Sequence, residues 1–142
     1  MKNKLRNSKK IISMYLYTLL CLLLLSGCSQ NETITKTETN YMQITAKEAK
    51  NIMDNETDYI ILDVRTEEEF IEGHIDGAIL IPDYEITEKA EKILTDKDQL
   101  ILVYCRSGRR SKLAADSLAT MGYTNIKEFG GIIDWPYGVV TK

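Results

Sequence analysis

The stretch that decides the fold is Leu-Ile-Leu-Val-Tyr-Cys-Arg-Ser-Gly-Arg-Arg-Ser, which occupies positions 100–111. Its first five residues are apolar and rich in β-formers, and this pattern predicts a buried strand. Beyond it, apolar residues recur at helical spacing from Ala114 to Met121, and Gly122 then supplies a stop. We therefore expect Cys105 to lie where a strand ends and a helix begins.

The loop at this junction is suited to hold an anion. Backbone N–H groups at a helix start, together with arginine side chains, attract negative charge, and a thiolate is the reactive form of cysteine. An inert buried cysteine is the alternative, but the arginines make the position too polar for a core. The candidate catalytic residue is therefore Cys105. The residues expected to form a cradle around it are Arg106, Ser107, Gly108, Arg109 and Arg110.

The rest of the chain alternates between strand and helix patterns. Strands are expected at 41–44, 59–62, 78–81, 100–104 and 123–129, with Gly130 and Gly131 ending the last one. Helices are expected at 45–54, at 86–94, after the Cys105 loop and, as a short helix, from Thr66. Phe70 and Ile71 should face inward from the short helix, and Ile93 from the helix at 86–94. Residues 132–135 are expected to form one helical turn. This order predicts an α/β fold, a small and mainly parallel sheet of about five strands with helices on both faces. Ligands of such sheets bind at the carboxyl ends of strands, where Cys105 is expected.

The N-terminal segment has the pattern of a secretory signal peptide. Residues 1–27 hold five basic residues, no acid and an apolar run over 11–25. The junction Leu-Ser-Gly-Cys that ends at Cys28 resembles the lipobox of bacterial lipoproteins. This resemblance implies cleavage before Cys28 and acyl chains, such as palmitate, on that residue. A plain membrane anchor or a cysteine there by chance are the alternatives.

The expected organisation is therefore a signal peptide (1–27), a polar tether (28–40) and one folded domain (41–142). The lipid would hold the domain on the extracytoplasmic side of a bacterial cell membrane. Without residues 1–27 the chain has 13 basic and 21 acidic residues, a net charge of −8, which argues against nucleic acid as a partner.

The few cysteines and the single histidine limit which kinds of catalytic or metal site the domain can hold. Cys21 falls in the signal and Cys28 is the expected lipid site, so Cys105 would be the one free thiol of the domain. A domain with one thiol has no disulfide framework and no resolving cysteine. His74 is the single histidine and no Cys-x-x-Cys pattern occurs, so neither a metal site nor a cofactor is expected.

Taken together, the motifs resemble one known family. The loop at 105–111 looks like the active-site loop of rhodanese-type sulfurtransferases, and Leu-Asp-Val-Arg at 62–65 and Gly-His-Ile at 73–75 resemble the first-half signature of that family. The resemblance covers about residues 41–137. Its remaining pieces are Glu69-Phe70, Gly77-Ala78, Gly130-Gly131 and Trp135.

The resemblance implies a two-step sulfur transfer. The Cys105 thiolate would take the outer sulfur of a donor such as thiosulfate, sulfite would leave, and a thiol or cyanide would then accept the sulfur from the Cys105 persulfide. The partners implied are a small anionic sulfur donor and a thiol acceptor.

Loop length separates this chemistry from related ones. Four residues lie between Cys105 and Arg110, whereas related phosphatases and arsenate reductases resemble Cys-x5-Arg, with one more residue to surround a tetrahedral oxyanion. An arsenate reductase or phosphatase is therefore the less favoured alternative. A non-catalytic persulfide carrier or anion-binding module stays open, because the groups that bind a persulfide also make it.

Roles of the neighbouring charges follow from the same resemblance. Arg110 would orient the loop and stabilise its charge, and Arg106 and Arg109 would face the entrance and guide anions. Asp63 and Arg65 follow a strand at the same sheet edge; Asp63 is expected in a structural ion pair, and Arg65 either there or beside the active site.

Two further residues of the motifs invite a catalytic interpretation. His74 is expected to be structural rather than a general base, since the proposed chemistry needs no base. Glu69 stands three residues after Thr66 and is expected to be a helix cap.

Overall fold

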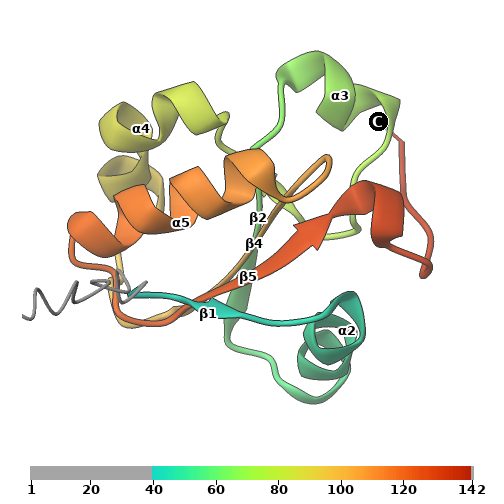
Figure 1. Cartoon of the computed structure of the whole chain (residues 1–142), viewed down its shortest axis with the longest axis horizontal. Helices are drawn as coiled ribbons and strands as arrows, with labels where there is room; N and C mark the ends of the chain where they lie inside the picture. Colours follow the sequence, from blue (N-terminus) through green and yellow to red (C-terminus); the bar gives the residue numbers. More distant parts are fainter. Residues whose placement is uncertain (1–39, 142) are drawn as a thin grey trace, which may run out of the picture. The chain divides into compact units, whose positions relative to one another are not determined.

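The fold is a five-stranded sheet in which every strand pair is parallel. The computed structural model describes residues 40–141. The strands are β1 (Met42–Gln43), β2 (Tyr59–Asp63), β3 (Ile79–Leu80), β4 (Leu100–Cys105) and β5 (Ile126–Gly131). Their order in the sheet is β1-β5-β4-β2-β3, so β4 lies in the centre (Figure 1).

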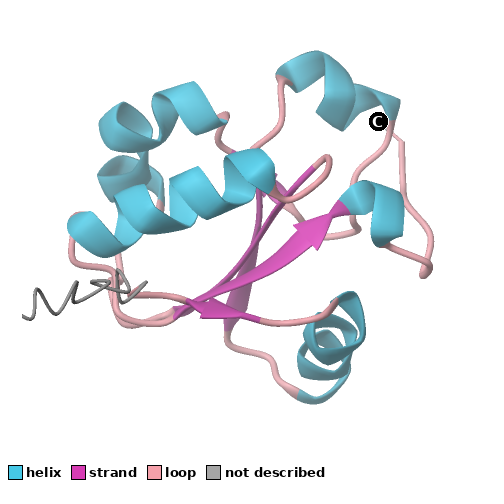
Figure 2. Ribbon diagram, viewed as in Figure 1, coloured by secondary structure: helices cyan, strands magenta, loops and turns pink. Residues whose placement is uncertain are grey.

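Helices cover both faces of this sheet, as Figure 2 shows. The α-helices are α2 (Ala46–Asn55), α3 (Glu67–Glu72), α4 (Ile86–Ile93) and α5 (Arg109–Thr120), and two 3-10 turns are η1 (Asp83–Glu85) and η2 (Ile132–Asp134). Helices α4 and α5 lie on one side and α2 on the other (Figure 1). The predicted fold class, parallel pairing and two-sided cover are therefore confirmed.

Two capping boxes start helices where the sequence predicts them. The Thr45 backbone N–H donates to Glu48 at 2.7 Å, and the Glu48 N–H donates back to the Thr45 hydroxyl at 3.2 Å. Thr66 and Glu69 repeat this exchange at 3.1 and 3.3 Å. Each box satisfies two N–H groups that the first turn leaves without helical partners, so both helices have defined starts.

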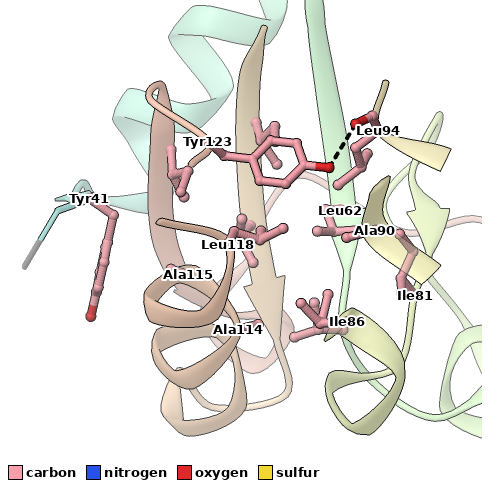
Figure 3. Packing of buried hydrophobic residues seen from close by; sticks show 14 of the residues in the cluster. Tyr41, Leu62, Ile81, Ile86, Ala90, Leu94, Ala114, Ala115, Leu118 and Tyr123 are labelled. Atoms are coloured by element: carbon pink, nitrogen blue, oxygen red, sulfur yellow. Dashed lines mark hydrogen bonds between the residues drawn. The ribbon is translucent and has the colours of Figure 1, made fainter. Parts of the chain in front are cut away.

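The core lies on both faces of β4. All six residues of this strand are buried, as is usual for a parallel strand covered on both sides. One apolar cluster joins the sheet to α4 and α5, and the other joins it to α2 and Trp135. Figure 3 shows part of the first cluster, in which the Tyr123 hydroxyl donates to the Leu94 carbonyl at 2.7 Å. The same cluster includes Cys105, at the carboxyl end of β4.

Some predicted boundaries are wrong. Strand β5 begins at Ile126, later than expected. It also includes Gly130 and Gly131, because Gly131 has extended dihedral angles and pairs with Cys105. Strand β1 has two residues rather than four. Ile71 and Ile93 are 48% and 46% exposed, so neither faces inward. Helix α3 has only six residues, and Phe70 is the one it buries.

The predicted signal peptide at 1–27, the lipidation of Cys28 and almost all of the tether concern residues outside the described range. Within residues 40–141, no helix is both long and apolar enough to cross a membrane.

Candidate active site

Cys105 is the last residue of the central strand, at its carboxyl end. Helix α5 begins at Arg109, so the reversal from strand to helix takes three residues. Cys105 is 1% exposed and packs in the α4–α5 cluster. The expectation that this position is too polar for a core is therefore wrong for the cysteine itself, because its arginine neighbours project outward while the backbone closes over the sulfur.

Backbone donors surround the Cys105 sulfur. The Gly108 N–H donates to Sγ at 3.1 Å, and the N–H groups of Ser107 and Ser111 also stabilise the thiolate. Gly108 has φ +92°, a left-handed conformation that glycine adopts without steric cost. This turn aims successive N–H groups at one point, which is the geometry of an anion-binding nest.

The pKa of the Cys105 thiol reflects two opposing effects. Burial raises it, while hydrogen bonds from the Ser111 hydroxyl and from the backbone N–H groups of Ser111, Ser107 and Gly108 lower it. The hydrogen bonds prevail, so the pKa lies below its ordinary value. The thiolate is thus favoured mainly by hydrogen-bond donors within the loop, among them the backbone N–H groups that the sequence led us to expect there.

Contacts with η2 and with the last residue of β5 fix the orientation of the loop. The Arg106 carbonyl accepts a hydrogen bond from the Ile133 N–H at 3.3 Å. Since the C=O and N–H of one peptide plane point in opposite directions, this bond turns the Ser107 N–H toward the sulfur side. A Cβ at Gly131 would lie 2.2 Å from that same carbonyl oxygen, so only glycine permits this approach.

Arg110 binds a carboxylate of α3. Its Nη1 donates to Glu69 Oε2 at 2.7 Å and its Nη2 to Glu69 Oε1 at 2.8 Å. The hydrogen bonds from Arg110 hold the pKa of Glu69 at about 2. Glu69 therefore caps α3, as expected, and also ties α3 to the first turn of α5.

The other two arginines of the loop face solvent. Arg106 and Arg109 are exposed, and neither forms an ion pair with any group in residues 40–141. Their positions beside the cradle place two unpaired positive charges near Cys105.

Asp63 and Arg65 form a buried cluster at the neighbouring strand end. The Arg65 Nη2 donates to Asp63 Oδ2 at 2.6 Å and to the Gly73 carbonyl at 2.7 Å, and the guanidinium lies over the Tyr104 ring. Arg65 is 5% exposed and Asp63 is fully buried. This pair joins β2 to the crossing that follows α3, and its donors are engaged within the protein.

The His74 side chain is held by contacts with Phe70. Its Nδ1 lies 2.8 Å from the Phe70 carbonyl, and its ring stacks on Phe70 with 3.7 Å between centroids. These contacts match the structural role expected for it. Within residues 40–141, no cluster of three His, Cys, Asp or Glu side chains could hold a metal ion.

Sequence reasoning missed one polar group of the site, Glu128. This residue of β5 is 2% exposed, and its Oε1 accepts hydrogen bonds from the Ser111 hydroxyl at 2.6 Å and the Gly130 N–H at 2.9 Å. The period of two along β5 places it on the same face as Ile126, a signal that could have identified an inward carboxylate.

Comparison with known proteins identifies the family. The family model described as "Rhodanese-like domain" matches residues 45–135. The chain belongs to the rhodanese-like family. A relative of this rhodanese-like chain is "Thiosulfate sulfurtransferase PspE" of Escherichia coli, 40% identical over 73 residues, which are 51% of this chain and 70% of PspE. The family membership and this named enzyme make the chain a transferase.

Two further comparisons show the extent of the match. The solved structure titled "rhodanese with anions from E. coli" has a TM-score of 0.56 and 36% identity, and the match covers 59% of this chain and 99% of that one. "Adenylyltransferase and sulfurtransferase UBA4" of Candida albicans is 34% identical over 107 residues, which are 70% of this rhodanese-like chain but 24% of UBA4. The chain thus spans only about a quarter of that relative.

Proposed function

We propose that the protein transfers sulfane sulfur from a small anionic donor such as thiosulfate, through a persulfide on Cys105, to a thiol or to cyanide. In the first step the electron pair of the thiolate forms a bond to the outer sulfur of thiosulfate. The S–S bond of thiosulfate breaks, and sulfite leaves with its electrons. In the second step a thiolate or cyanide attacks the outer sulfur of the persulfide and releases the Cys105 thiolate. Neither step needs an external oxidant or reductant.

The observation that carries this proposal is the ring of donors around the Cys105 sulfur. The Gly108 N–H lies 3.1 Å from Sγ, and the pKa of the thiol is lowered by the loop although burial raises it. A lowered pKa increases the fraction of thiolate at neutral pH. Donors fixed before the reaction need no reorganisation as charge moves from the inner to the outer sulfur.

The engagement of Arg110 supports sulfur transfer over phosphoryl or arsenate chemistry. A tetrahedral oxyanion needs a planar guanidinium that presents two donors to its oxygens. Here both terminal nitrogens of Arg110 are bound to Glu69, at 2.7 and 2.8 Å. With four residues between Cys105 and Arg110, the loop is also one residue shorter than the Cys-x5-Arg of the phosphatase type.

The exposed arginines support an anionic donor. Arg106 and Arg109 belong to the cradle and have no carboxylate partners in the described residues, while the chain after residue 27 carries a net charge of −8. A local positive patch on an acidic protein concentrates small anions at the site.

Membrane attachment through Cys28 is a separate part of this proposal. The Leu-Ser-Gly-Cys junction that ends at Cys28 supports it, and the domain would then act on the extracytoplasmic side of a bacterial cell membrane. Growth with an alkyne-tagged palmitate analogue tests this. The wild-type chain should carry the tag, and Cys28→Ala should lose it together with membrane association.

Steady-state transfer from thiosulfate to cyanide tests the activity. The wild-type chain should form thiocyanate and Cys105→Ser should not, whereas Cys28→Ser should retain the activity in detergent. A persulfide that forms on Cys105 without turnover would identify a carrier instead. Release of inorganic phosphate from aryl phosphates by the wild type would overturn the proposal.

A further inference from the structure

A buried carboxylate lies directly behind the Cys105 loop. Glu128 is 2% exposed, and no lysine or arginine in residues 40–141 forms an ion pair with it. Its Oε1 accepts hydrogen bonds from Ser111 Oγ at 2.6 Å and from the Gly130 N–H at 2.9 Å. A carboxylate without a cation is costly to bury, so its position beside a second potential anion calls for a physical reason.

The Ser111 hydroxyl contacts both this carboxylate and Gly108, whose own N–H donates to the Cys105 sulfur. Ser111 is fully buried in the first turn of α5, and its hydroxyl is one of the groups that lower the pKa of Cys105. The same oxygen lies 2.6 Å from Glu128, 3.1 Å from the Gly108 carbonyl and 3.4 Å from the Gly130 carbonyl. A hydroxyl has one hydrogen, so a bond donated to Glu128 is not donated to the sulfur.

Charge decides this competition. A hydrogen bond to an ionised carboxylate is short and about twice as strong as one between neutral groups. The 2.6 Å separation is the shortest that Ser111 Oγ makes. The hydrogen bond to the Glu128 carboxylate therefore competes with the one by which the same hydroxyl lowers the pKa of Cys105, and weakens it.

We propose that Glu128 is a positioning residue of the active site, which competes for the Ser111 hydroxyl and so weakens one hydrogen bond to the Cys105 sulfur. Its effect differs between the two states of the cycle. The thiolate carries its charge on the inner sulfur, next to Ser111, whereas a persulfide carries it on the outer sulfur. A weaker hydrogen bond to the inner sulfur keeps the thiolate nucleophilic and favours transfer of the charge outward. This catalytic consequence rests on the persulfide chemistry proposed above.

Other charged and titratable groups face the same region. Arg110 on α5 interacts with Cys105 and is paired with Glu69 of α3. On the side of Glu128, burial raises the pKa of Tyr41, and Asp116 and Glu128 add to that shift. Glu128→Gln alters none of these groups chemically, so the substitution tests the contribution of the Glu128 carboxylate.

The pH dependence of Cys105 alkylation tests the proposal. The full chain in detergent is treated with iodoacetamide at a series of pH values, and the peptide that holds Cys105 is quantified by mass spectrometry. We expect Glu128→Gln to lower the alkylation midpoint by about one pH unit, because the amide competes less for the hydroxyl hydrogen. In a Ser111→Ala background the same change should shift it by less than about a third of that amount. Asp134→Asn removes an exposed carboxylate just beyond β5 and should leave the midpoint unchanged.

An unchanged midpoint in Glu128→Gln, or an equal shift with and without Ser111, would overturn the proposal. Should Glu128→Gln fail to fold, carbon-13 NMR of the wild-type glutamate carboxyls provides the answer. The Glu128 resonance should then shift as Cys105 ionises, and this response should shrink in Ser111→Ala; its absence in the wild type would equally overturn the proposal. Neither measurement uses a sulfur donor, so the result stands apart from whether thiosulfate is a substrate.

Discussion

Arg110 and Glu69 bind each other through two parallel hydrogen bonds, of 2.7 and 2.8 Å, that join the start of α5 to the capped start of α3. Glu69 also accepts the Thr66 N–H at 3.1 Å. One carboxylate thus caps a helix and fixes the arginine that ends the Cys105 loop. The position of Arg110 is therefore set by α3, which is 41 residues away from it in sequence.

The Glu69–Arg110 pair predicts a pH-dependent part of the stability. The pKa of Glu69 is lowered from 4.5 to about 2, chiefly by its hydrogen bonds with Arg110 and further by the Thr66 N–H, so these contacts stabilise the fold above pH 4.5 and their contribution is lost as the pH falls toward 2. Glu69→Gln should lower the free energy of unfolding at neutral pH by on the order of 2 kcal/mol, and the difference from wild type should shrink on acidification. Urea unfolding from about pH 7 to about pH 3 measures it.

Glu48→Gln is the matched control, because Glu48 holds the same capping-box position in α2 and pairs with no arginine of residues 40–141. It should cost less and show a weaker dependence on pH. Equal curves for the two variants would mean that the cap, rather than the arginine, explains the effect of Glu69.

Arg110 should have a small electrostatic effect on the thiol. The pKa of Cys105 is lowered mainly by hydrogen bonds that the loop donates to its sulfur. Arg110 interacts with Cys105 only as a nearby charge. Arg110→Ala should raise the pKa of Cys105 by less than about one unit and slow persulfide formation accordingly. Adding Glu69→Ala removes a negative charge and should return the pKa toward its wild-type value. Thiolate absorbance against pH, in chains with Cys21 and Cys28 changed to Ser, reports both shifts; a larger effect of Arg110 would give the arginine the leading role.

Much of the architecture could be predicted because its signals are local. Two capping boxes, an entirely apolar β4 and the turn at 105–111 place Cys105 at the carboxyl end of a central strand, as the structure has it. The ends of β5 could not be predicted, because the role of Gly131 depends on the Arg106 carbonyl of another strand end. Glycine normally signals a break, and here it permits a close approach instead.

The site itself was only partly predictable. The cysteine and its loop could be identified from adjacent residues, but the partners of the loop come from elsewhere in the chain. Glu69 and Glu128 lie 41 and 17 residues from the groups that they bind. Such pairings follow from strand order and register, which sequence periodicity does not specify.

Gly131 and Gly130 should respond differently to the same substitution. A Cβ at Gly131 would lie 2.2 Å from the Arg106 carbonyl oxygen, whereas a Cβ at Gly130 meets nothing within 4 Å. Gly131→Ala must displace the loop and should lower both the unfolding free energy, by about 3 kcal/mol or more, and the sulfur-transfer rate. Gly130→Ala introduces only the strain of φ +92°, about 1–2 kcal/mol, and should keep most of the activity. Urea unfolding and thiocyanate formation distinguish them; equal losses would refute the close-approach argument.

Arg65 and Arg106 should separate stability from substrate capture. Arg65→Ala leaves Asp63 buried without its partner and should cost about 3–5 kcal/mol of unfolding free energy.

Arg106→Ala removes an exposed side chain and should change stability by less than about 0.5 kcal/mol, but it should slow the reaction with thiosulfate most strongly at low salt. Rapid-mixing kinetics at two ionic strengths checks the second effect. A salt-independent rate loss would argue against steering by Arg106.

The formation of a persulfide on Cys105 tests the central claim most directly. The full chain is incubated with thiosulfate, freed of excess donor and digested, and the Cys105 peptide is weighed by mass spectrometry. The proposed chemistry predicts a gain of one sulfur atom on that peptide, its removal by cyanide with release of one thiocyanate, and no gain in Cys105→Ser. A Cys105 that stays unmodified by thiosulfate, while iodoacetamide still alkylates it, would contradict the claim.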